Sequence, residues 1–349
     1  MSCSYADGLS HYEDKGVLGV PEIFDKEESI NIKCSLLAEW ILQAKHVVVH
    51  TGAGISTSAG IPDFRGPNGV WTLEQKGLQP TINTSFNEAI PTKTHMALRK
   101  LVEEGYVKFI VSQNIDGLHL RSGLPRKYLA ELHGNMFAEQ CKTCQKQFVR
   151  CIATSSVGEK CLDKNCPRGR LNGRNCRGKL YDTILDWEAN LPDNDLKLSE
   201  LHSSIADLNI CLGSTLQIVP SGNLPICNKK YCGKLAVINL QPTKHDKKAD
   251  LIINTYVDVV IEKVMKRLGL EIPEYSTETD FSRDEDLIND KKVIDWTTVT
   301  TNMAELQKKY DQQWSSYKKR RLEDKKVKED IKRCKAEIKR DLEAGNSKI

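Results

Sequence analysis

The chain has 349 residues, 39% of them hydrophobic, and a formal net charge of +4 at pH 7. This length and composition can bury a sizeable core, which excludes a fully disordered protein. No apolar stretch approaches the roughly 18 residues of a membrane span, and residues 1–25 lack the apolar region of a secretion signal. We therefore expect no membrane association. The twelve cysteines are then expected in a reducing compartment, as free thiols or metal ligands.

The first informative element is the apolar run at residues 46–49 (HVVV), which predicts a buried parallel strand. It ends at residues 50–56 (HTGAGIS), before a predicted helix. Glycine accepts positive φ and lets backbone N–H groups approach a pyrophosphate at the positive end of a helix. The usual dinucleotide fingerprint has a third glycine at the position of Thr57 in this chain. It also has an acidic residue about twenty positions farther on, and this chain has no such residue at the end of a second predicted strand. The turn therefore fits nucleotide binding or a plain tight turn.

The next segment, residues 60–71, is rich in glycine and carries Phe64, Arg65 and Trp71. It is too irregular to be a core element and fits a lid over a ligand. The aromatic rings could cover a flat ring, while the planar fork of arginine donors suits a phosphate or a ribose. An Ω-like loop packed by its own aromatic side chains is the alternative interpretation.

A second apolar strand is predicted at residues 106–112, and it leads into Gln113, Asn114 and Asp116. Polar side chains just past the carboxyl end of a strand lie where open α/β sheets bind ligands, although Asn-x-Asp-Gly is also an ordinary turn. Farther on, Gly134 follows His133 and leaves room for a substrate beside the imidazole. A neutral imidazole could accept a proton from a ribose hydroxyl, whereas a lone histidine is also often structural.

Four cysteines in polar, basic surroundings have the spacing of metal ligands: Cys141, Cys144, Cys166 and Cys176. Four thiolates favour Zn²⁺, and an all-cysteine shell leaves no open position for water, so the metal should be structural. A redox pair at the first two positions and unpaired thiols are the alternatives. Cys161 also lies in this region and competes with Cys166 as the third ligand. Cys151 has no evident partner.

In this order, the motifs resemble the signature series of the sirtuin family: residues 52–56 (GAGIS), 60–65 (GIPDFR), 113–116 (QNID), 133–134 (HG) and the four cysteines. Within that family the chain is most similar to the sirtuin-6 type, over about three quarters of its length. The segments that carry this second similarity are residues 5–10 (YADGLS), 18–25 (LGVPEIFD), 182–188 (DTILDWE), 239–246 (NLQPTKHD) and 268–273 (LGLEIP).

The resemblance implies a doubly wound, Rossmann-like parallel α/β sheet with a smaller inserted zinc module. We expect a catalytic core over residues 1–273, with the zinc module at about 134–180. Residues 274–349 form a charged extension in which apolar residues recur at steps of three or four from Val327 to Leu342, as in a solvated helix.

The resemblance also implies an NAD-dependent protein-lysine deacylase, in which the acyl oxygen attacks C1′ of the nicotinamide ribose and nicotinamide leaves. His133 would be the base for the ribose hydroxyl, with Asn114 and Gln113 near the ribose and Asp116 near the nicotinamide. The other implied NAD contacts are Ala53, Thr57, Phe64, Arg65, Trp71, Gly213, Ser214, Thr215, Asn239, Gln241 and Val257. Residues 186–188 (DWE) resemble a segment that pairs with the substrate peptide as an added strand.

The expected substrates are acylated lysine peptides, above all histone tails, cleaved by deacetylation or long-chain deacylation to O-acyl-ADP-ribose. Mono-ADP-ribosyl transfer is a further implied activity, and a nuclear, chromatin-associated protein with a role in DNA repair is the implied setting. The run at residues 318–321 (KKRR) fits a nuclear signal, a contact to nucleosomal DNA, or a merely solvated helix face. A non-catalytic NAD-sensing chromatin module and an NAD-linked dehydrogenase are the competing functions.

Overall fold

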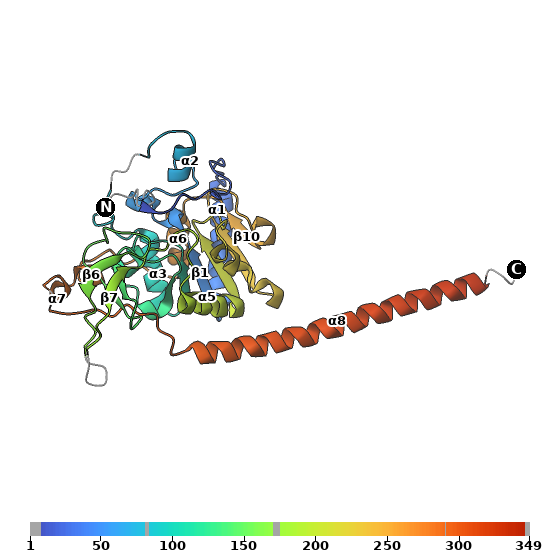
Figure 1. The fold of residues 1–349 in the computed structure, drawn as a ribbon. Helices are drawn as coiled ribbons and strands as arrows, with labels where there is room; N and C mark the ends of the chain where they lie inside the picture. Colours follow the sequence, from blue (N-terminus) through green and yellow to red (C-terminus); the bar gives the residue numbers. More distant parts are fainter. Residues whose placement is uncertain (1–7, 81–83, 170–174, 290, 346–349) are drawn as a thin grey trace. The chain divides into compact units, whose positions relative to one another are not determined.

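A computed structural model describes residues 8–80, 84–169, 175–289 and 291–345 of the chain (Figure 1). In the last helix, side chains are described as far as Glu323 and again at Lys326 and Val327. The chain divides into two compact units, Met1–Asn302 and Met303–Ile349. The first unit contains both sheets, and the second is one long helix with the residues that follow it.

The larger sheet is parallel and has the strand order β10-β9-β8-β1-β2-β3. Every residue of β1 and β8 is buried, as strands covered on both faces require, and this explains their continuous apolar sequences. The predicted doubly wound, Rossmann-like architecture is confirmed. The strands are β1 (Val47–Thr51), β2 (Val107–Ser112), β3 (Leu129–Glu131), β8 (Leu208–Leu212), β9 (Lys234–Ile238) and β10 (Leu251–Ile253).

The chain extends this sheet from β1 in two directions. β2 and β3 follow on one side, whereas β8, β9 and β10 are added on the other. The direction in which strands are added therefore reverses between β1 and β8, and the loops after these neighbouring strands meet at the carboxyl edge of the sheet. Open α/β sheets bind their ligands at such a topological switch point.

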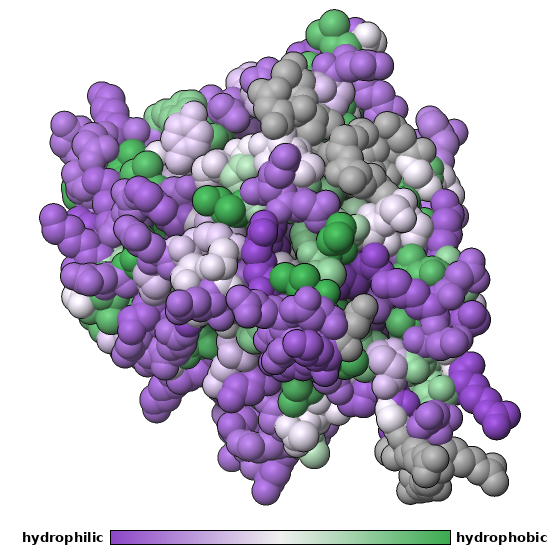
Figure 2. Space-filling model, turned by 90° about the vertical axis from the view of Figure 1, so that its left-hand side faces the viewer, coloured by the Kyte–Doolittle hydropathy of each residue, from purple (hydrophilic) through white to green (hydrophobic). Residues whose placement is uncertain are grey.

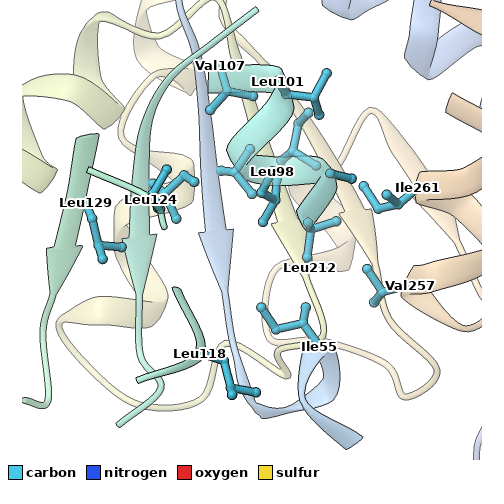
Figure 3. Packing of buried hydrophobic residues seen from close by; sticks show 14 of the residues in the cluster. Ile55, Leu98, Leu101, Val107, Leu118, Leu124, Leu129, Leu212, Val257 and Ile261 are labelled. Carbon is cyan, nitrogen blue, oxygen red and sulfur yellow. The ribbon is translucent and has the colours of Figure 1, made fainter. Parts of the chain in front are cut away.

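Three helices pack together over one face of the sheet: α1 (Glu27–Gln43), α3 (Lys93–Glu103) and α6 (Val257–Arg267). Figure 3 shows α3 from close by, with Leu98 and Leu101 in contact with the apolar side chains of the sheet. The first turn of α3 is stabilised by a capping box, in which the side chains of Thr92 and His95 each bond to the other's backbone N–H.

The opposite face of the sheet is covered by α5 (Asp193–Ile205), whose His202 stacks on Phe109 of β2 with ring centroids 4.1 Å apart. Leu235 and Val237 of β9 belong to a second apolar cluster that is separate from the one under α3. Alternate residues of the strands therefore serve two cores, one on each face. The shorter helices are α2 (Val70–Gln75), α4 (Leu118–Arg121) and α7 (Glu285–Ile288).

The smaller sheet is antiparallel, with the strand order β5-β4-β7-β6, and is inserted between β3 and α5. Residues beyond α6 return to it, because Phe148 of β5 forms an antiparallel bridge with Asp295. The same returning segment carries Asp280, which forms a buried ion pair with Arg121 at 3.1 Å. The strands are β4 (Ala138–Cys141), β5 (Gln147–Val149), β6 (Cys161–Asn165) and β7 (Lys179–Asp182).

The second unit contains α8 (Met303–Gly345), which confirms the expected helical tail. Its Leu322 and Val327 are exposed. Within the described part of the chain, no helix combines the length and the apolar character of a membrane span. On the molecular face drawn in Figure 2, hydrophilic side chains predominate and hydrophobic ones form small separate patches.

Candidate active site

A cavity of about 380 Å³ opens at the switch point of the large sheet. Its walls come from the loops after β1, β2, β3, β8 and β9, together with the segment that contains Phe64, Arg65 and Trp71. The other predicted site residues that line it are Ala53, Gln113, Asn114, Asp116, His133, Gly213, Ser214, Thr215, Asn239 and Gln241. Two predicted residues lie outside this lining: Thr57, whose hydroxyl donates to the Gly54 carbonyl, and Val257, which is buried in the apolar core.

The floor of the cavity is formed by two loops whose backbones touch. Gly52 N–H donates to Leu212 O at 3.0 Å, and Gly54 N–H donates to Gly213 O at 2.9 Å. A Cβ atom at Gly54 would lie 2.7 Å from the Cα of Gly213, and one at Gly52 would lie 2.7 Å from the Gly213 carbonyl oxygen. These positions therefore exclude side chains, and the turn after β1 is a close backbone contact between two loops.

A chain of hydrogen bonds fixes the polar side chains at the end of β2. Asn114 Nδ2 donates to Gly52 O at 3.1 Å and to Ser56 Oγ at 3.2 Å, and Ser56 Oγ donates in turn to Asp116 Oδ2 at 2.7 Å. Burial raises the pKa of Asp116, while the N–H of Leu118 and the Ser56 hydroxyl oppose that shift. The sequence analysis missed Ser56, although it lies inside the GAGIS motif.

His133 lies in the loop after β3, and its ring has a defined tautomer. Nδ1 lies 2.9 Å from the carbonyl oxygen of Gln113. A carbonyl oxygen only accepts hydrogen bonds, so Nδ1 carries the proton and donates it. Nε2 is then the basic nitrogen, and the hydroxyl of Ser221 lies 3.5 Å from it. Burial lowers the pKa of His133 to about 4, against the opposing effect of the Gln113 carbonyl. The imidazole is therefore neutral near pH 7 and can accept a proton at Nε2.

Gly134 holds this loop in a conformation that only glycine adopts readily. Its φ is +93°, and a Cβ atom would lie 1.9 Å from the carbonyl oxygen of Thr183. The loop is also held by a hydrogen bond from Leu185 N–H to His133 O at 3.2 Å. Gly134 is expected to leave room beside the imidazole. In the structure it also packs tightly against the segment that precedes α5.

Arg65 has the geometry of a ligand-binding arginine. Its guanidinium lies 4.6 Å from the centre of the Trp71 ring, and Nε donates to Lys15 O at 3.0 Å. Nη2 is buried and has no hydrogen-bond partner among the described residues. Burial lowers the pKa of Arg65 to about 10, so the group stays charged at neutral pH. A buried cationic donor without a partner fits a phosphate-bearing cofactor such as NAD, since burial of such a donor costs free energy unless a ligand satisfies it.

Residues 8–25 also contribute to the site, which the sequence analysis missed. Leu9 and Tyr12 line the cavity, and the Tyr12 ring stacks on Trp187 with centroids 5.3 Å apart. The Ser10 hydroxyl donates to Asp186 Oδ2 at 2.5 Å. These contacts span more than 170 positions in the chain, and no local pattern could have predicted them.

The four predicted cysteines converge at one end of the small sheet. The sulfur atoms of Cys141, Cys144, Cys166 and Cys176 all lie within 4.8 Å of one another. Gly178 N–H donates to the Cys176 sulfur at 3.4 Å, and a side chain at Gly178 would collide with the sulfur of Cys141. Cys161 is exposed and lies outside this group. Four clustered thiols fit a structural Zn²⁺ and provide no open coordination position.

Comparison with known proteins agrees with this geometry. The Sir2 family matches residues 78–220. The NAD-dependent protein deacetylase Sirt6 of Drosophila melanogaster is 59% identical over 312 residues, which cover 89% of this chain and 96% of that protein. The structure of Sir2Tm bound to a propionylated peptide superimposes with a TM-score of 0.52 at 30% identity, and the match covers 68% of this chain and 100% of that one. A complex of Sir2 with a p53 peptide and NAD⁺ gives 0.50 at 30% identity, over 67% and 98% of the two chains.

The fold and the cavity thus define an α/β protein with a nucleotide-type site at its switch point and a cysteine-bearing insertion. The chain belongs to the Sir2 family, the sirtuins, as its motifs indicated. The matched Drosophila relative is an NAD-dependent protein deacetylase, and the superimposed structures contain peptide or NAD⁺ ligands.

The cysteine geometry predicts which thiols bind zinc. Cys166→Ser removes one of four clustered sulfurs and should lose most of the bound metal and part of the stability, because metal binding and folding are coupled. The matched Cys161→Ser should keep about one zinc per chain. Elemental analysis of both purified variants, together with thermal unfolding, measures this. Equal zinc content in the two variants would contradict the assignment.

A second prediction concerns Gly134. Gly134→Ala should lower the free energy of unfolding by about 3 kcal/mol, because the cost of a positive φ and the cost of the collision with Thr183 O are summed. The control is Gly269→Ala, where φ is +70° but a Cβ would meet no described atom within 4 Å. It should cost about 1 kcal/mol. Urea unfolding of both variants measures the difference, and equal losses would mean that the contact with Thr183 does not constrain this loop.

Proposed function

We propose that this chain is an NAD-dependent protein-lysine deacetylase in which His133 acts as the general base. The observation that carries the proposal is the neutral, single-tautomer imidazole of His133 in the same cavity as Asn114. A general base must be unprotonated at working pH and within reach of the proton it removes. Burial of His133 supports the first condition, and its position in the cavity lining supports the second.

NAD would be held by the residues around the glycine floor and beneath the aromatic lid. Arg65 supplies the unpartnered cationic donor, and the loops that touch at Gly54 and Gly213 leave a smooth backbone surface for close approach. Ser214 and Asn239 lie at the ends of β8 and β9, where the adenosine half would bind. When bound, NAD supplies the ribose that receives the acyl group and the nicotinamide that leaves.

Asn114 orients the reacting hydroxyl in this proposal. Its two amide hydrogens are used by Gly52 O and Ser56 Oγ, so Oδ1 remains as the acceptor for a ribose hydroxyl or a water. His133 Nε2 takes the hydroxyl proton, while the Gln113 carbonyl holds the proton on Nδ1 and stabilises the imidazolium. The raised pKa of Asp116 follows from its burial beside these groups and suits a carboxyl that bonds to an uncharged amide.

The substrate peptide would bind against the loop after β7. Residues 186, 187 and 189–191 line one side of the cavity, and Val219 and Pro220 also line it. An extended peptide between them could add as a strand, with main-chain hydrogen bonds accepting many sequences. Asp186 in this lining and the exposed Glu188 beside it carry negative charge, which complements the lysine- and arginine-rich tails of histones.

The apolar part of the cavity supports activity on longer acyl groups. Ile61, Phe64, Phe86 and Ile184 contribute to its lining, and burial of each additional methylene is favourable by about 0.8 kcal/mol. We therefore include long-chain deacylation in the proposal. Mono-ADP-ribosyl transfer follows if a protein nucleophile takes the place of the acyl oxygen.

The proposed setting is the nucleus, on chromatin and in DNA repair. The basic run at residues 318–321 lies within α8, where Lys318 also contacts the ring of Trp314 at 5.1 Å. Several cations on one helix could bind nucleosomal DNA by counterion release, an attraction that weakens with salt. This basic run and the homology to the Drosophila Sirt6 protein support the assignment.

The test incubates the full-length protein with NAD and either an acetylated or a myristoylated histone peptide. His133→Asn should lower the rate of O-acyl-ADP-ribose formation at least about 100-fold, because it removes the base. His46→Gln, at the opposite end of β1, is the control and should keep the parent rate. Mass spectrometry of O-acyl-ADP-ribose and nicotinamide provides the readout and ranks the two acyl groups.

Three results would contradict the proposal. Parent-like turnover by His133→Asn would exclude the histidine as base. NAD binding without any consumption would favour the chromatin-binding module, and accumulation of NADH would favour a dehydrogenase.

A further inference from the structure

A short segment beyond α6 packs against the loop that carries His133. We name residues 294–298 the C-terminal strap. The strap continues the small sheet beside β5: Val149 N–H donates to Ile294 O at 3.0 Å, and Trp296 N–H donates to Gln147 O at 2.8 Å. It belongs to the same compact unit as the cavity.

Trp296 connects the strap to the His133 loop through a buried carboxylate. Its indole Nε1–H donates to Glu131 Oε2 at 2.8 Å, and Asn135 Nδ2 donates to Glu131 Oε1 at 2.6 Å. Glu131 and Asn135 are each two positions from His133, one before it and one after it. Both oxygens of this carboxylate are thus bonded, and the bonds span the segment that holds the base. Trp296 is 2% exposed and Glu131 is 6% exposed, so water does not replace either bond.

Arg126 and Asp195 close this network from the other side. Arg126 Nε donates to the Trp296 carbonyl at 3.0 Å, and its Nη2 donates to Asp195 Oδ1 at 2.7 Å and to the Thr298 hydroxyl at 2.8 Å. The same Asp195 oxygen accepts the backbone N–H of Glu131 at 3.0 Å. Buried charges persist only when they are paired and hydrogen-bonded, so removal of one member should disturb the others.

The position of the His133 loop explains why such support is needed. β3 has three residues, forms the edge of the large sheet and pairs on one side, with β2. An edge strand of this length defines the direction of the following loop weakly. The strap contacts β3 through the bond from Trp296 to the Glu131 side chain, and Thr298 bonds to Arg126 and Asp195.

We propose that Trp296 is a positioning residue for His133, acting through the carboxylate of Glu131. Catalysis loses rate steeply when a reacting group moves by about 1 Å, even if substrates still bind. The inference rests on the proposed role of His133 as base. It assigns a part in deacetylation to a residue outside the cavity lining.

The network also has an expected pH dependence. Burial raises the pKa of Glu131 to about 7; Asp195 also raises it, whereas Arg126 and the donors of Trp296 and Asn135 lower it. Protonation removes the negative charge that strengthens both bonds and turns one oxygen into an O–H donor, so Glu131 then accepts the donors of Trp296 and Asn135 more weakly. The turnover number should therefore fall as the pH drops below about 7. His133 is neutral down to about pH 4 and does not account for a decline in that range.

The experiment compares parent, Trp296→Phe and Trp40→Phe full-length proteins in steady-state deacetylation from pH 5.5 to 9. Trp40 lies in α1 with its ring against Lys234 and serves as the matched control. Trp296→Phe keeps the ring but removes the donor to Glu131. It should lower kcat about tenfold at pH 7, leave KM for NAD within about twofold, and shift the acidic limb to higher pH. Trp40→Phe should match the parent.

A second variant covers the case in which Trp296→Phe does not fold. Glu131→Gln cannot titrate, so its kcat should lose the acidic limb near pH 7. A parent-like kcat and pH profile in Trp296→Phe would overturn the inference, as would an unchanged acidic limb in Glu131→Gln. An inactive parent protein would instead refute the proposed function, so the two failures are distinguishable.

Discussion

The contact between two glycine backbones at the switch point is the constraint on which the rest of this site depends. Gly54 and Gly213 bring the loops after β1 and β8 within hydrogen-bonding distance, and neither position has room for a side chain. Because the loops meet there, the ends of β2 and β3 can place Asn114 and His133 in the same cavity. The parallel sheet is the rigid support, and the loops at its carboxyl edge carry the polar side chains of the cavity.

Burial then gives the polar groups their properties. His133 remains neutral because its imidazole is desolvated, and the Gln113 carbonyl fixes which nitrogen is basic. The same physical effect raises the pKa values of Asp116 and Glu131, two carboxyls that bond to amide, hydroxyl or indole donors. Burial thus sets the charge state of the histidine that we propose as the base and favours the uncharged form of these two carboxyls.

The sequence predicted the elements that have local signals and missed the contacts that do not. Apolar runs such as residues 46–49 and the glycine turn after them are local patterns, so the sheet and its ligand edge followed. The cysteine spacing likewise indicated a metal group, and the structure places Cys166 in it and Cys161 outside it. The stacking of Tyr12 on Trp187 and the bond from Trp296 to Glu131 join distant segments, which a single sequence does not reveal.

We propose that the contact between Gly54 and Gly213 shapes the NAD site, and calorimetric titration of NAD measures this. Gly213 has a φ of +62°, and a Cβ there would lie 2.6 Å from the carbonyl carbon of Gly54. Gly213→Ala should therefore separate the two loops and weaken NAD binding at least about tenfold, with an unchanged circular dichroism spectrum. Equal NAD affinity in the parent and the variant would show that the cofactor binds elsewhere and that this contact does not shape its site.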